Sequence, residues 1–308
     1  MDFVGKRGWF FLASLITVVA SVISLILPGG LNAGLEFSGG SSITVAFEED
    51  VSQSGLRSAM EELGHPDAMV QRLGEGNFFI RTRTLEEAEG DGLSEREIII
   101  SGLESALGSQ VTRSELFSVS PSIAAETVRN AIVILVIASV AILLYITWAF
   151  RKVPSPLRYG ISAIIALLHD VVVVVGIFSI VGRYLDLEVN AMFIAGVLTI
   201  IGYSVHDTIV VFDRLRENLI RGFGHDLGST INISIEDTLG RSLNTSVTLL
   251  FTIIALLLFG GPTIFEFLLI LFIGIIVGTY SSIWIASQVL LVWENKEFGS
   301  MARKLLPF

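Results

Sequence analysis

The chain has no cysteine among its 308 residues, which excludes disulfide bonds, thiolate metal sites and thiol catalysis. Charge is also scarce, because Asp, Glu, Lys and Arg make up only 16% of the residues, whereas soluble domains carry about a quarter. Apolar residues of the AVILMFWYC set make up 52%, and the mean hydropathy is +0.73. This composition disfavours a soluble globular protein and predicts an integral membrane protein.

Positive charge is especially scarce in one segment. Residues 28–123 hold six Arg, no Lys and sixteen Asp or Glu, so this segment alone accounts for the net charge of −10. An acidic chain is a poor ligand for a nucleic-acid backbone. The sequence therefore predicts an acidic, water-soluble insert within a nearly neutral membrane body.

Long apolar runs with almost no charge predict transmembrane helices. Six such runs can be marked: Trp9–Leu27, Thr127–Trp148, Tyr159–Val181, Val189–Phe212, Leu243–Phe259 and Ile264–Trp293. The first run is longer than the apolar core of a signal peptide, and Pro-Gly-Gly at 28–30 is a poor cleavage site, so we expect a retained anchor. The predicted organisation is 1–27 (tail and first span), 28–123 (insert), 124–293 (spans two to six) and 294–308 (tail).

The distribution of Lys and Arg in the short flanking segments predicts the orientation. Basic residues precede the first span, lie between spans two and three and between spans four and five, and recur in the tail: Lys6, Arg7, Arg151, Lys152, Arg158, Arg214, Arg216, Arg221, Arg241, Lys296, Arg303 and Lys304. The loop 182–188 holds one Arg, and the loop 260–263 holds no basic residue. We therefore expect both termini to be cytoplasmic and the insert to lie on the outer side.

The insert has alternating strand patterns and helical patterns in a fixed order. A strand at 42–47, a helix at 52–63, strands at 68–73 and 77–83 joined by Gly-Glu-Gly at 74–76, a helix at 93–107 and a strand at 111–119 are predicted. This β-α-β-β-α-β order is that of a ferredoxin-like α+β domain. Its carboxylates are scattered and it holds a single histidine, so we predict a binding or lever domain without catalysis.

Ionisable residues inside a bilayer need a partner or a function. Span three carries His169 and Asp170, and span four carries His206 and Asp207; Glu266 lies near the outer end of span six and is interpreted as interfacial. Asp170 is at mid-span without an evident basic partner. Asp207 is about five residues from the cytoplasmic end of its span, roughly 7–8 Å below the membrane edge.

Polar residues recur at helical spacing on spans four and five. The two predicted polar faces consist of Thr199, Gly202, Tyr203, His206 and Asp207, and of Arg241, Asn244, Thr245, Thr248 and Thr252. Asp207 and Arg241 are expected at the same depth, which predicts an interhelical ion pair. Such a pair could simply hold helices together, or it could act as a protonation switch in an ion pathway.

Three classes of function compete. An ion-driven transporter accounts for the buried carboxylates and the large insert. An intramembrane aspartyl protease would need two aspartates at one depth, but Asp170 and Asp207 differ in depth, and Ser204 is not in a Gly-x-Ser-Gly motif. A scaffold or receptor would not require buried Asp and Arg on facing helices. Transport is therefore favoured, and neither an enzyme activity nor a cofactor or metal site is predicted.

Two blocks of sequence resemble a known family. Gly34-Leu-Glu-Phe-Ser-Gly-Gly40 and the segment 189–218, which contains Gly-Tyr-Ser-Val-His-Asp-Thr at 202–208, are similar to SecF, the protein-export membrane subunit of the SecD/SecF family in the RND-type superfamily. The segment Thr238–Ser246 resembles that family's fifth span. One span, an insert and five further spans also match the family's layout.

The resemblance implies a polytopic membrane protein of the bacterial or archaeal cytoplasmic membrane. It implies a complex with SecD beside the SecYEG channel, with a small auxiliary subunit of the YajC type, that uses the proton-motive force to export unfolded preproteins. It also implies Asp207 as the ion-coupling carboxylate, Arg241 as its basic partner and Asp213 as a further carboxylate; His206 and Asp170 complete the expected ion-coupling set.

The chain departs from the family pattern at Glu36, His206 and Ser242, where the family often has Asp, Asn and Thr. His206 adds a titratable group beside Asp207. Coupling to protons or to sodium stays open, as does the alternative of an RND-type half-transporter for lipids or small molecules.

Overall fold

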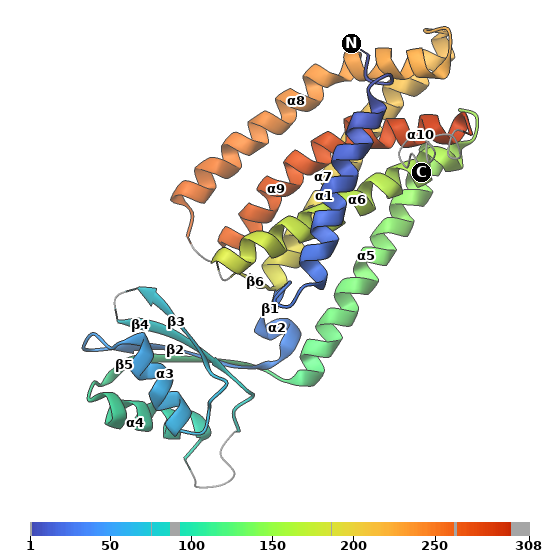
Figure 1. The fold of residues 1–308 in the computed structure, drawn as a ribbon. Coiled ribbons are helices and arrows are strands. Elements are labelled where there is room, and N and C mark those ends of the chain that lie inside the picture. Colours follow the sequence, from blue (N-terminus) through green and yellow to red (C-terminus); the bar gives the residue numbers. More distant parts are fainter. Residues whose placement is uncertain (1, 75, 87–92, 186, 262–263, 297–308) are drawn as a thin grey trace, which may run out of the picture. The chain divides into compact units, whose positions relative to one another are not determined.

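The computed structural model describes residues 2–74, 76–86, 93–185, 187–261 and 264–296. Glu75, in the predicted Gly-Glu-Gly turn, lies outside these ranges, as does the predicted tail from residue 297 onward with Arg303 and Lys304. The chain divides into two compact units: a helical unit of Met1–Asn32 with Ile132–Phe308, and a sheet unit of Ala33–Ala131. Figure 1 shows the elements of each.

Six helices in the described residues are long and apolar enough to cross a membrane, which confirms the six predicted spans. They are α1 (Arg7–Ile26), α5 (Pro121–Ala149), α6 (Pro156–Leu185), α7 (Ala191–Arg221), α8 (Leu227–Phe259) and the continuous rod of α9 (Phe265–Ser281), the π-helical turn η2 (Ser282–Ala286) and α10 (Ser287–Glu294). The fifth helix begins sixteen residues before the predicted start of its span at Leu243. Its added turns are polar, so hydropathy alone did not reveal them.

Local sequence signals set the ends of α7 and α8. The Asn190 side chain caps α7 by accepting from Phe193 N, and Gly222 ends that helix in the left-handed region at φ 71°. Asp226 and Ser229 form a reciprocal capping box at the start of α8. These caps fix a turn of only a few residues between the two helices.

The sheet unit is the predicted ferredoxin-like domain. Its strands and helices follow in the order β2 (Gly40–Phe47), α3 (Gln53–Glu62), β3 (Met69–Gly74), β4 (Asn77–Thr82), α4 (Glu95–Leu107) and β5 (Val111–Val119). The sheet order is β3-β4-β2-β5 with antiparallel pairing throughout, which is the split βαβ arrangement. The short helix α2 (Leu35–Ser38) precedes β2, and the two-residue strands β1 (Asn32–Ala33) and β6 (Glu188–Val189) form a separate small sheet.

The sheet unit has its own apolar core and one buried histidine. Ile43, Leu56, Phe78, Ile80 and Leu103 are all fully buried between the sheet and the two helices. His65, 4% exposed, lies beside this core, with Nδ1 3.0 Å from Thr82 Oγ1 and Nε2 3.5 Å from Glu95 Oε1. Burial lowers the pKa of His65 below its ordinary value of 6.5.

Small residues bring helices of the helical unit into close contact. An added Cβ at Gly274 of α9 would lie 2.1 Å from Ile200 Cδ1 of α7, and one at Gly176 of α6 would lie 2.1 Å from Ser21 Cβ of α1. Such close approach is typical of membrane helices, which pack through Gly, Ala and Ser. The Gly-x-x-x-Gly pattern at 274–278 is therefore used in helix packing.

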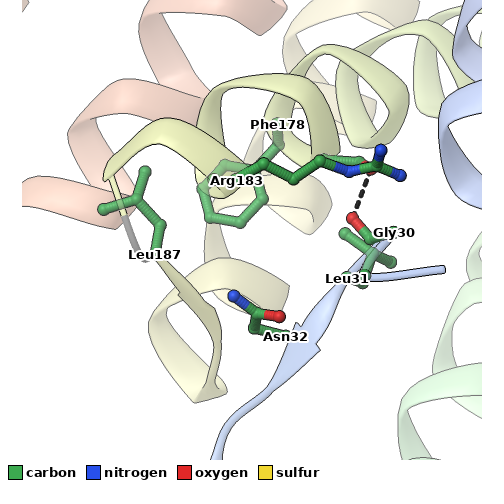
Figure 2. A pocket seen from close by; sticks show the side chains of 9 residues that line it. Gly30, Leu31, Asn32, Phe178, Arg183 and Leu187 are labelled. Atoms are coloured by element: carbon green, nitrogen blue, oxygen red, sulfur yellow. Dashed lines mark hydrogen bonds between the residues drawn. The ribbon is translucent and has the colours of Figure 1, made fainter.

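The end of α1 is held on α6 by polar contacts around a narrow recess (Figure 2). Arg183 Nη2 donates to the carbonyl oxygen of Ser24 at 2.5 Å, and Ser179 Oγ donates to the carbonyl oxygen of Gly30. The last carbonyls of a helix have no partner within the helix. Arg183 supplies a donor to one of these carbonyls, and Ser179 binds the segment that follows α1, so the first span is fixed to the third.

Candidate functional site

Asp207 lies on the inward face of α7, where only 7% of the residue is exposed. Ser242 Oγ of α8 donates to its Oδ1 at 2.6 Å. Its other oxygen, Oδ2, is buried and receives no hydrogen bond from any residue that the structure describes. Only one of the two carboxyl oxygens of Asp207 thus has a hydrogen-bond partner among the described residues, which is unfavourable in free energy for a buried carboxyl group.

The predicted ion pair between Asp207 and Arg241 is not formed: within the described ranges, no salt bridge joins the two side chains. Arg241 is exposed, whereas Ser242, the next residue of α8, is 1% exposed and faces Asp207. Successive residues of an α-helix point about 100° apart. The serine therefore occupies the position toward α7 that the sequence pattern gave to the arginine.

The polar faces of α7 and α8 point away from the interior of the helical unit. Thr199, Gly202 and His206 of α7 are exposed, and so are the α8 residues Arg241, Asn244, Thr245, Thr248 and Thr252. Val197, Ile201 and Val205 of α7 are buried, as Asp207 is. Asp207 therefore belongs to the inner face of α7, and His206 belongs to the outer polar face.

Tyr203 bridges the two faces. It is half-buried, and its hydroxyl lies 2.7 Å from Ser246 Oγ of α8. Ser246 Oγ also lies 2.6 Å from Thr279 Oγ1 of α9. One turn from the Asp207–Ser242 bond, these hydroxyls join α7, α8 and α9.

Asp170, which has no evident basic partner in the sequence, accepts hydrogen bonds from several neighbours in the structure. It is 1% exposed; His169 Nδ1 lies 2.9 Å from its Oδ1. Its Oδ2 accepts from Ser204 Oγ of α7 at 2.5 Å and from Ser281 Oγ of α9 at 2.6 Å. Asp170 thus joins three helices.

The two serines that bind Asp170 were not identified as site residues from the sequence. Ser204 enters the sequence analysis only in the exclusion of a Gly-x-Ser-Gly protease motif. Their role depends on contacts across 34 and 111 residues of chain. A buried Asp in mid-span was the only available signal that hydroxyl donors had to exist.

Asp213 lies in an ionic network where α7 meets the start of α8. Arg216 Nη2 is 2.8 Å from Asp213 Oδ1, and Arg214 binds both Asp237 of α8 at 2.8 Å and Glu217 at 2.6 Å. This network lies at the end of the helical unit that also carries Arg151, Lys152 and Arg158. We call this end of the helical unit the basic end. Asp213 is thus separated from Asp207 by nearly two helical turns.

Glu266 sits at the opposite end, as an interfacial residue would. It accepts from Glu188 N at 3.1 Å and from the Asn190 side chain. Across the part of the chain that the structure covers, no three His, Asp or Glu side chains gather as metal ligands.

Comparisons with known proteins agree with this arrangement. The family model described as "Protein export membrane protein SecD/SecF, C-terminal" matches residues 100–296. The protein translocase subunit SecF of Thermobaculum terrenum is 44% identical over 317 aligned positions, covering 100% of this chain and 98% of that protein. SecF of Vibrio alginolyticus is 36% identical, covering 96% of this chain and 89% of that protein.

Longer relatives contain a region similar to this chain. The protein translocase subunit SecDF of Bacillus subtilis is 34% identical, covering 96% of this chain and 38% of that protein. The crystal structure of SecDF, a translocon-associated membrane protein, from Thermus thermophilus superposes with a TM-score of 0.80 at 33% identity, over 96% of this chain and 39% of that one.

Proposed function

Because this chain belongs to the SecF family of protein-export membrane proteins, it is a multi-pass membrane subunit of bacterial Sec-dependent protein translocation, and we propose that it couples an ion gradient to that process. The proposed ion is the proton, and the proposed carrier is Asp207.

The observation that carries the proposal is the state of Asp207. A carboxyl group that is 93% removed from solvent, with one oxygen bonded to Ser242 and the other without a partner in the described chain, is poised to change protonation state. One charge that crosses 100 mV releases about 2.3 kcal/mol. That free energy shifts a two-state equilibrium roughly fifty-fold, which is enough to drive a conformational cycle.

A SecD-like partner is proposed to cover the exposed polar faces of α7 and α8. Polar side chains of membrane helices face protein or water rather than lipid, and here Arg241, His206 and the threonines of α8 point away from this chain's own interior. In SecDF relatives, the region similar to this chain is only about two fifths of the protein. We propose that the partner supplies the missing part, and that Arg241 acts in the joined complex.

Further residues, partners and the orientation in the membrane belong to the same proposal. Asp170, Asp213 and His206 are proposed as auxiliary ion-coupling residues, SecYEG and a small YajC-type subunit as neighbours, and unfolded preproteins as substrates. Both termini are proposed to be cytoplasmic and residues 28–123 to be extracytoplasmic. The asymmetry of Lys and Arg between the two ends of the spans supports this orientation.

The test is preprotein export by membrane vesicles with and without a proton gradient. Asp207→Asn removes the titrating group and keeps the shape, and we expect gradient-stimulated export to fall at least tenfold. Asp237→Asn, the same chemical change in the exposed network of the basic end, is the matched control and should retain most of the activity.

A second variant tests the arginine. Arg241→Lys keeps the charge but loses the planar fork that binds a carboxylate through two bonds, so we expect a similar loss of stimulation. Full gradient-stimulated export by Asp207→Asn, in membranes that hold equal amounts of each protein, would overturn the coupling role.

A further inference from the structure

Three polar side chains on α6 and α10, two helices that pack against each other, are fully buried and have polar atoms without a partner among the described residues. Ser162 of α6 and Ser287 and Gln288 of α10 are each 0% exposed. Among the residues that the structure describes, none bonds to Ser162 Oγ, to Ser287 Oγ or to either polar atom of Gln288. Buried polar atoms in proteins are nearly always bonded to protein or to ordered water. These groups therefore indicate a ligand that is small and polar.

The unpartnered atoms follow the helices toward Asp170. Ser162 and His169 are seven residues apart on α6, so they share one face and lie about 10 Å apart along the axis. His169 Nε2 is also buried without a partner in the described chain, while Nδ1 of the same ring bonds Asp170. Gln288 lies on the facing rod, two turns from Ser281, the other partner of Asp170.

The facing rod is irregular at this level. The π-helical turn η2 lies between Ser281 and Gln288 and packs against α6, as does α10. A π turn widens the helix and interrupts its regular ladder of hydrogen bonds, and such turns occur frequently at functional sites. The irregular turn and the unpartnered side chains thus lie on the same stretch of the sixth span.

The same two helices end at a cavity. A hollow of about 310 Å³ at the basic end is lined by Tyr159 of α6, Glu294 of α10 and Lys152, among others. Tyr159 precedes Ser162 by one turn, and Glu294 follows Gln288 by less than two turns. Glu294 Oε2 is 2.5 Å from Arg158 Nη1, while its Oε1 is buried without a described partner. The other residues that line the cavity are apolar, and Tyr159, Lys152 and Glu294 mark a mouth at the end of the line of unpartnered groups.

We propose that Ser162, Ser287 and Gln288 line a narrow water-filled path from this cavity to the His169–Asp170 pair, separate from the Asp207 site. With Nδ1–H donated to Asp170, Nε2 of a neutral His169 is a bare acceptor that faces the path. A proton that binds at Nε2 displaces no group; the Nδ1 proton can then pass to Asp170 Oδ1 along the existing hydrogen bond. Tyr159, Glu294, Arg158 and Lys152 are the titratable groups at the mouth.

This inference rests on the proposed ion coupling for its purpose, but the water itself can be detected without any gradient or export. Hydroxyl radicals made from water by brief X-ray exposure oxidise side chains in contact with water, and sulfur reacts fastest. The chain lacks native cysteine, and none of its five methionines lies within ten residues of position 162 or 288, so oxidation of an introduced sulfur atom can be assigned to its own peptide. The protein is used in its complex, in native membranes, with mass spectrometry as the readout.

The reporters have matched controls of equal burial. Gln288→Met is compared with Leu290→Met, since both changes keep volume and Leu290 is also 0% exposed. Ser162→Cys is compared with Ala163→Cys, its 2% exposed neighbour. We expect each path reporter to be oxidised at least tenfold faster than its control. Rates equal to those of the controls would overturn the path.

A blocking variant tests continuity. Gln288→Leu, combined with Ser162→Cys, replaces the amide by an apolar group of similar size and should slow oxidation at position 162 at least fivefold. Unchanged oxidation would show that the two positions do not share one path. If the path reporters are oxidised no faster than their controls while Asp207→Asn still loses gradient-stimulated export, the path is rejected and the coupling role stands. If the path reporters are oxidised rapidly while Asp207→Asn retains export, the coupling role is rejected and the path stands.

Discussion

At the residue scale, the two buried aspartates of the helical unit differ in how many donors they receive. Among the described residues, Asp170 has a histidine and two serine hydroxyls as partners, whereas Asp207 has only the Ser242 hydroxyl. Several donors hold a carboxyl group in one position, whereas a carboxyl group with a single donor can respond to whatever approaches its free oxygen. This contrast favours Asp207 as the switching group and Asp170 as a group that also ties helices together.

Ser242→Ala should destabilise the protein by about 1–3 kcal/mol, because it removes the one hydrogen-bond donor that the described residues supply to the buried Asp207 carboxyl. The measurement is thermal unfolding of the purified protein in detergent, followed by circular dichroism. Ser246→Ala also removes hydrogen bonds but no contact to a carboxylate, so its effect should be smaller. Equal effects of the two variants would contradict the role assigned to Ser242.

Low pH should reduce the stability of the sheet unit, because protonation of the buried His65 favours its unfolded state. Because burial lowers the pKa of His65 below 6.5, the unfolded unit takes up the proton first, and stability falls as pH drops below about 6.5. The pKa of Glu95, lowered below 4.5 chiefly by the backbone N–H of Glu86, adds a loss of the same sign at more acidic pH.

Hydrogen exchange of α3 and β3 peptides, corrected for intrinsic rates, is the measurement of this acid effect. Exchange should accelerate between pH 7.5 and 5.5 in the native chain, and His65→Gln should flatten this dependence. His225→Gln, a change in an exposed residue outside the sheet unit, is the control. The same pH dependence in both variants would exclude His65 as its source.

At the element scale, the sequence was a good guide to which segments are helices and a poor guide to their rotation. The six spans and the β-α-β-β-α-β order follow from hydropathy and periodicity, which are local properties. The inward face of α8 was predicted one residue out of phase, because Arg241 and Ser242 are both polar and only tertiary contacts decide between them. The π turn at Ser282–Ala286 and the partners of Asp170 also depend on distant contacts that no local pattern encodes.

Close packing of α7 on α9 should be sensitive to a single methyl group. Gly274→Ala places a Cβ 2.1 Å from Ile200 Cδ1 in a packed interior, so we expect a loss of about 1–3 kcal/mol. Gly202→Ala, on α7 with no atom within 4 Å of the added Cβ, should be neutral or stabilising.

Thermal unfolding of both glycine variants is the measurement, with Ile200→Val added to Gly274→Ala as a test of mechanism. The smaller side chain should recover part of the loss, since the two residues are in direct contact. Equal stability of the Gly274 and Gly202 variants would show that α7 and α9 do not pack as closely as described.

At the scale of the whole molecule, charge and hydropathy divide the chain in the same way as its contacts do. The acidic segment 28–123 largely coincides with the compact unit Ala33–Ala131, and the near-neutral remainder forms the helical unit. Composition could therefore predict the two-part organisation. It could not predict which contacts each unit makes inside, since these depend on packing.

The orientation predicted from Lys and Arg can be measured with single introduced cysteines. A membrane-impermeant maleimide, added to intact cells, should label Ser101→Cys of α4 and should label Arg221→Cys at the basic end only after permeabilisation. Both positions are exposed, so unequal reactivity would report sidedness. The reverse pattern would invert the topology.

The pairing of β2 with β5 has a consequence for the evolution of such proteins. Gly40 at the start of β2 lies opposite Val119 at the end of β5, and Gly39 lies against Pro121, the first residue of α5. The N-terminal and C-terminal ends of the sheet unit are therefore close together, as in a domain that is inserted at one position of a chain. An inserted domain of this kind can be lengthened, shortened or replaced by another domain whose ends are also close together, without a change in the flanking transmembrane helices. One recombination event can in this way give the same helical unit a different inserted domain.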